Sequence, residues 1–95
     1  MGRDDYEHRM ERLVGDLGVQ IASVRARLAE SPDEGMKTEL ARELGQLDER
    51  RQSVREKLET LKDEPDGTWA DLRLQIEDEW DALIQDFEEG MASLA

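Results

Sequence analysis

The chain has 95 residues and a formal net charge of −12, with 40% charged and 37% hydrophobic side chains. This length suits one domain over residues 1–95. The absence of cysteine excludes disulfides, cysteine-ligated zinc, iron–sulfur clusters and thiol catalysis. The acidic balance argues against direct binding of nucleic acid or anionic lipid, which depends on clustered Lys and Arg, and favours a basic protein partner.

The first predicted helix covers residues 4–30. Its apolar side chains recur in steps of 4-3-4-4-3-4, close to the helix period. This stripe consists of Tyr6, Met10, Leu13, Leu17, Ile21, Val24 and Leu28. The string that follows has the pattern of a capping box, with Ser31 as N-cap, Pro32 at the first helical position and Glu34 closing the box.

The second predicted helix covers residues 32–62 and carries a strict 4-3 heptad stripe with one polar member. Its members are Leu40, Leu44, Leu47, Arg51, Val54, Leu58 and Leu61. We expect the Arg51 stem to pack in the seam. Its guanidinium then either reaches a carboxylate such as Glu79 or Asp78, or stacks on Trp80. Each arrangement would help to fix the register of the helices.

The third predicted helix covers residues 68–93. Pro65 ends the preceding helix, Asp66 and Gly67 form a turn, and Thr68 caps the new helix. Its stripe consists of Trp69, Leu72, Ile76, Trp80, Leu83, Phe87, Met91 and Leu94.

Short connections make sequential helices antiparallel neighbours. We therefore predict an all-α, up-down-up three-helix bundle with coiled-coil-like packing. A first turn near residues 31 and 32 would place Gly18 level with Gly45, either as a close backbone approach or as two tolerated weak spots. Tyr6 should lie near Trp69, because the first and third helices run parallel. Pairing of the same stripes between chains, in a homo-oligomer, is the rival arrangement.

The negative charge is concentrated in the last third of the chain. Residues 63–95 hold 11 acids and one base, whereas residues 1–62 hold 14 acids and 12 bases. On a helix, the acids between residues 77 and 89 fall on the two flanks of the apolar stripe. The candidate partner-binding residues are Glu77, Asp78, Asp81, Asp86, Glu88 and Glu89. They would either dock a basic protein or simply keep the exterior solvated.

The tryptophans and their neighbours carry a family resemblance. The segments Leu61-Lys62, residues 68–73 (TWADLR) and residues 79–83 (EWDAL) resemble a pattern in small coiled-coil proteins of cyanobacteria and proteobacteria, some of them labelled stress-response proteins. Arg73 stands where that pattern usually has Lys, and the last helix is more acidic here. The resemblance implies a helical protein linked to stress tolerance, with no catalytic residues to transfer.

Catalytic and metal sites are not expected. His8 is the one histidine and has neither a cysteine nor a second histidine to join it, and no Gly-rich phosphate loop or EF-hand loop is present. We therefore expect no cofactor and no enzymatic activity. We also expect a cytoplasmic location, because no apolar run is long enough to cross a bilayer. Protein–protein interaction is the leading function. The alternatives are a nucleic-acid-mimicking inhibitor of a DNA-binding protein and a self-assembling structural coiled coil.

Overall fold

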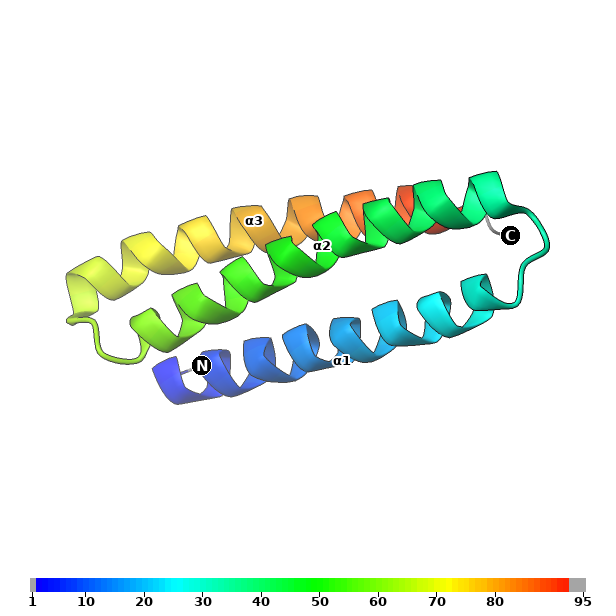
Figure 1. The fold of residues 1–95 in the computed structure, drawn as a ribbon. Helices are drawn as coiled ribbons and strands as arrows, with labels where there is room; N and C mark the ends of the chain where they lie inside the picture. The colour runs from blue at the N-terminus through cyan, green and yellow to red at the C-terminus, as the bar shows by residue number, and fades with distance from the viewer. Residues whose placement is uncertain (1, 93–95) are drawn as a thin grey trace.

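The computed structural model describes residues 2–92 as three antiparallel α-helices joined by two short connections (Figure 1). They are α1 (Arg3–Ala29), α2 (Glu34–Leu61) and α3 (Asp66–Ala92). The described part of the chain contains no strand, and the molecule is 51 Å long. The predicted all-α three-helix bundle is confirmed. Position 93 of the third predicted helix, and Leu94 of its stripe, lie outside the described residues.

The middle helix, α2, holds the bundle together. Its backbone packs closely against α1 on one side and α3 on the other, whereas no Cα atom of α1 lies within 8 Å of one in α3. Side chains bridge the wider seam: the rings of Tyr6 and Trp69 meet edge to face with centroids 5.6 Å apart. The predicted proximity of these two aromatics is confirmed.

The core forms two apolar clusters along the bundle. The cluster nearer the α1–α2 connection contains Leu17, Ile21, Val24, Leu28, Leu40, Leu44, Leu47, Leu83 and Phe87. The cluster nearer the α2–α3 connection contains Tyr6, Met10, Val14, Val54, Leu58, Leu61 and Ile76. Trp80 packs against both clusters and is only partly buried. In α2, the stripe position between the two sets of buried residues belongs to Arg51.

The apolar stripe of α1 differs from the prediction at one position. Val14 is buried, while Leu13 remains 37% exposed. Both residues fit a helical step from Met10 to Leu17, but Val14 points toward the seam that α2 and α3 share. The α3 stripe is also less covered than predicted, because Trp69 and Trp80 are only half-buried.

The predicted N-caps of α2 and α3 are wrong, and each of these two helices begins two residues from its predicted start. α2 begins at Glu34, because the Asp33 carboxylate caps it by accepting from the Met36 N–H at 3.0 Å. The Ser31 hydroxyl instead accepts from the Asp33 N–H. α3 begins at Asp66 rather than Thr68, since the Trp69 N–H donates to the Pro65 carbonyl at 2.8 Å.

The predicted pairing of glycines is not what sets the α1–α2 register. Gly18 lies against the guanidinium of Arg51, where an added Cβ would sit 3.0 Å from its central carbon. Gly45 faces open space, with nothing within 4 Å of such a Cβ. The close approach at Gly18 therefore accommodates a side chain of α2 rather than a second glycine.

Candidate functional site

The six predicted partner-binding acids do not share one environment. Asp86 is paired with Arg50 of α2 at 2.6 Å, and Glu77 is paired with Arg73 one helical turn away at 3.1 Å. The others are exposed and make no ion pair within the described residues. They are Asp78, Asp81, Glu88 and Glu89. Two of the six acids are thus already neutralised inside the molecule.

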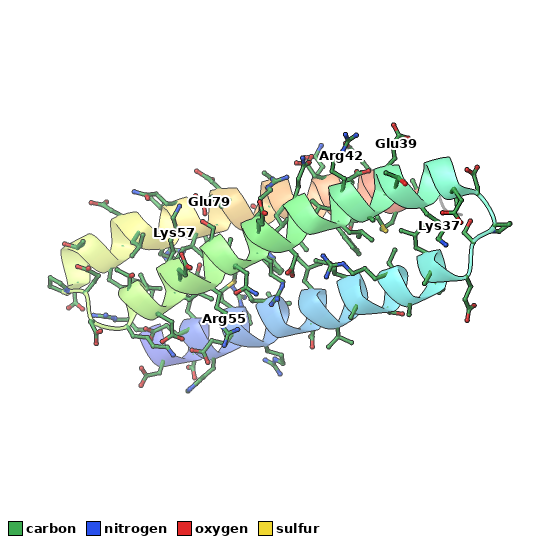
Figure 2. All side chains as sticks on the ribbon, viewed as in Figure 1. Lys37, Glu39, Arg42, Arg55, Lys57 and Glu79 are labelled. Atoms are coloured by element: carbon green, nitrogen blue, oxygen red, sulfur yellow. The ribbon has the colours of Figure 1, made fainter. Side chains whose placement is uncertain are left out.

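Asp86 belongs to a set of ion pairs between α2 and α3. Lys57 reaches across the seam to Glu79, and the two side chains meet between the helices in Figure 2. The Arg50–Asp86 pair repeats this contact two turns further along α3. Ion pairs this exposed contribute little to stability, but they direct the carboxylates of Glu79 and Asp86 toward α2. The opposite and outer surfaces of α3 keep their negative charge.

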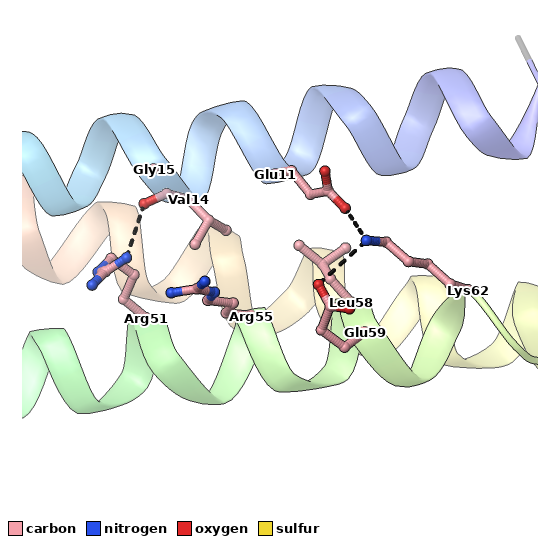
Figure 3. Close-up of a pocket in the computed structure, with 8 residues that line it drawn as sticks. All are labelled: Glu11, Val14, Gly15, Arg51, Arg55, Leu58, Glu59 and Lys62. Atoms are coloured by element: carbon pink, nitrogen blue, oxygen red, sulfur yellow. Dashed lines mark hydrogen bonds and ion pairs between the residues drawn. The ribbon is translucent and has the colours of Figure 1, made fainter.

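A pocket of about 330 Å³ opens between α1 and α2 (Figure 3). Lys62 is held there between Glu11, at 2.5 Å, and Glu59, at 3.3 Å. Lys62 donates hydrogen bonds to these two carboxylates, which raises the pKa of Lys62 above its usual value, so the group remains a cation. The charged groups of the Glu11–Lys62–Glu59 set already satisfy one another, which ties α1 to the end of α2.

Arg51 lies at the other end of this pocket and contacts α1 rather than α3. Its Nε donates to Asp48 at 2.8 Å, and its Nη1 donates to the Val14 carbonyl at 3.4 Å. The expected contacts with Glu79 or Asp78, or with the Trp80 ring, are therefore wrong. The stem packs as predicted, because only 14% of the side chain is exposed. The predicted direction failed because Gly18 opens space on the α1 side.

Aromatic rings and arginines meet at the end of the bundle where α1 begins. Arg3 donates to Asp66 at 2.8 Å and to the Glu64 carbonyl at 2.7 Å, so it ties α1 to the α2–α3 connection. The same guanidinium lies 5.2 Å from the Trp69 ring centre, and that of Arg73 lies 5.9 Å from the Tyr6 ring centre. These contacts are cation–π interactions that brace the wide α1–α3 seam.

Tyr6 is expected to ionise only in strongly alkaline solution. Burial, reinforced by the negative charge of Glu77, raises its pKa from 10.0 to about 12, and Arg73 offsets this only in part. Because the folded pKa exceeds the unfolded one, the stability that the neutral phenol contributes is complete below about pH 10 and is lost toward about pH 12.

Ultraviolet titration of the tyrosinate absorbance measures this pKa directly, since Tyr6 is the one tyrosine in the chain. Unfolding in urea should return the midpoint to about 10. A midpoint near 10 in the folded protein would contradict the burial of this hydroxyl.

The described residues do not gather the side chains that a metal site would need. His8 is exposed, and no group of three or more His, Asp or Glu side chains in the described range is placed to hold a metal ion. None of the described helices is sufficiently long and apolar to span a membrane.

Comparison with known proteins adds no assignment. No protein-family model, curated protein or solved structure matches this chain. The resemblance to bacterial stress-response coiled-coil proteins therefore stays a prediction, and the case for function depends on the surface of the bundle itself.

Proposed function

We propose that this protein is a non-enzymatic binding protein that docks a basic protein partner on the outer surface of α3. The observation that carries the proposal is the set of exposed α3 acids that lack ion pairs within the described residues. We define the α3 acidic surface as Asp78, Asp81, Glu88 and Glu89. We propose that this binding occurs in the cytoplasm and, following the resemblance, that it serves stress adaptation.

The physical basis is electrostatic. The local bases that α3 and its seam with α2 supply are already engaged: Arg73 with Glu77, Arg50 with Asp86, and Lys57 with Glu79. A surface of uncompensated carboxylates attracts a positively charged partner, raises the association rate and disfavours acidic competitors. Binding of this kind weakens as salt concentration rises, because exposed charges are screened.

Neutralising the α3 acidic surface is expected to abolish partner capture from lysate. The test variant carries Asp78→Asn, Asp81→Asn, Glu88→Gln and Glu89→Gln. A control variant carries the same number of neutralising changes on α1 and α2: Asp16→Asn, Glu39→Gln, Glu49→Gln and Glu56→Gln. All eight positions are exposed, and both variants lose the same negative charge.

Quantitative mass spectrometry of the captured proteins compares the two variants with the wild type across a salt series. The control should retain the wild-type partner, and the α3 variant should lose it. Equal loss in both variants would mean that net charge alone is responsible, and equal retention would remove α3 as the docking surface. Either of these outcomes contradicts the proposal.

A further inference from the structure

An acidic depression lies at the end of the bundle, away from the α3 acidic surface. It has a volume of about 680 Å³ and lies between the first turns of α1 and the α2–α3 connection. Five carboxylates and two cations line it. The carboxylates are those of Asp4, Asp5, Glu7, Asp63 and Glu64. We call this depression the end pocket.

The two cations of the end pocket are committed elsewhere. Arg3 uses its guanidinium on Asp66 and on the carbonyls of Leu61 and Glu64. Lys62 pairs with Glu11 of α1 and with Glu59 of α2. Neither cation pairs with a carboxylate of the end pocket, and five carboxylates against two cations leave the lining with a net negative charge.

Glu7 separates this pocket from an ordinary acidic surface. Glu7 lines the pocket, is only 6% exposed, and its buried Oε1 accepts no hydrogen bond from any described residue. No ion pair to Glu7 occurs within residues 2–92. A buried carboxylate oxygen without a donor is unfavourable, because it has lost its contact with water and has gained no hydrogen bond in return. A ligand that brings N–H donors and positive charge would remove that penalty.

We propose that the end pocket receives an arginine side chain of the basic partner protein. A guanidinium is planar, permanently charged and less strongly hydrated than an ammonium group, and its five donors can bridge two carboxylates at once. Glu7 supplies the buried acceptor, and Asp63 and Glu64 of the connection also line the pocket. The inference rests on the proposed function, because it names the partner's side-chain chemistry at a second point of contact.

Titration with N-acetyl-arginine amide tests this directly on the full chain, followed by ¹⁵N–¹H NMR. The amides of Glu7, Asp63 and Glu64 should shift with a roughly millimolar Kd, as suits so small a probe. N-acetyl-citrulline amide, which has the same shape without the charge, should leave them unmoved. N-acetyl-lysine amide should bind more weakly than the arginine probe.

Glu7→Gln should weaken binding of the arginine probe by about tenfold or more, since it removes the buried charge. Its melting temperature should stay equal to or above that of the wild type, because an unpaired buried charge is lost. Glu56→Gln, an exposed change on α2, is the matched control and should bind as the wild type does. Asp63→Asn, an exposed change in the connection, should weaken binding without disturbing a helix.

Unshifted amides, equal response to the citrulline probe, or wild-type affinity in the Glu7→Gln variant would overturn the end pocket as an arginine site. The outcome is separable from that of the α3 acidic surface. Arginine binding at Glu7 with capture unaffected by the α3 variant would retain the pocket and remove the surface. Loss of capture in the α3 variant with no arginine binding would retain the α3 acidic surface and remove the end pocket.

Discussion

Truncating Leu44 to alanine should lower the free energy of unfolding by about 3–5 kcal/mol, the upper range for a fully buried leucine. Leu44 has no exposed surface and lies on α2, the helix against which both others pack. Truncation of Leu44 leaves a cavity in the core. Neither α1 nor α3 can move into that cavity without moving away from the other helix. The free energy of unfolding of a domain of this size is about 5–15 kcal/mol, so this truncation removes a large part of it.

Urea denaturation followed by far-ultraviolet circular dichroism gives this free energy for the wild type and the variant. Leu74→Ala is the matched control, because the same truncation falls on a side chain that is 53% exposed on α3. It should change stability by no more than about 0.5 kcal/mol. A comparable loss at Leu74 would contradict the exposure of this side chain on the outer surface of α3.

The sequence predicted the helices well because one physical signal dominates it. A buried residue every three or four positions leaves few alternatives to a helix, and two prolines mark the interruptions. The same signal does not choose between Leu13 and Val14, since both lie three or four residues from Met10 and Leu17. The choice depends on the directions of two partner helices, which no local pattern encodes.

The predicted starts of α2 and α3 were wrong for a related reason. Ser31 and Asp33 are both good N-caps, and local preference scarcely separates them. The structure chooses Asp33 because its carboxylate reaches the Met36 N–H. At the second connection Pro65 supplies the first intrahelical acceptor through its carbonyl, at 2.8 Å from the Trp69 nitrogen. A side-chain cap at Thr68 is therefore not needed.

The charged groups were the least predictable part of the candidate site. Arg3 and Glu7 stand four residues apart and would ordinarily be expected to pair on the surface of α1. Arg3 instead donates to the carbonyls of Leu61 and Glu64, which leaves Glu7 buried with no partner in the part of the chain that the structure describes. Likewise, Asp86 looks like any other acid in the sequence until the position of Arg50 on the neighbouring helix is known.

Replacing Arg51 by alanine should cost about 2–3 kcal/mol of unfolding free energy. Three losses combine: the packed stem, the charge-assisted bond to Asp48 at 2.8 Å, and the donor to the Val14 carbonyl at 3.4 Å. The space beside Gly18 would also be left empty, because the guanidinium now fills it. Urea denaturation of the variant measures the sum.

Arg51→Leu separates packing from polar bonding at this position. If the residue mainly packs and sets register, leucine restores the apolar contact and the loss falls to within about 1 kcal/mol. The Asp48 carboxylate, whose side chain is 29% exposed, can then turn to water. A loss as large as that of Arg51→Ala would instead assign the stability to the polar bonds. Because a polar residue in an aliphatic seam disfavours slipped alignments, the leucine variant should also associate more readily, which light scattering would detect.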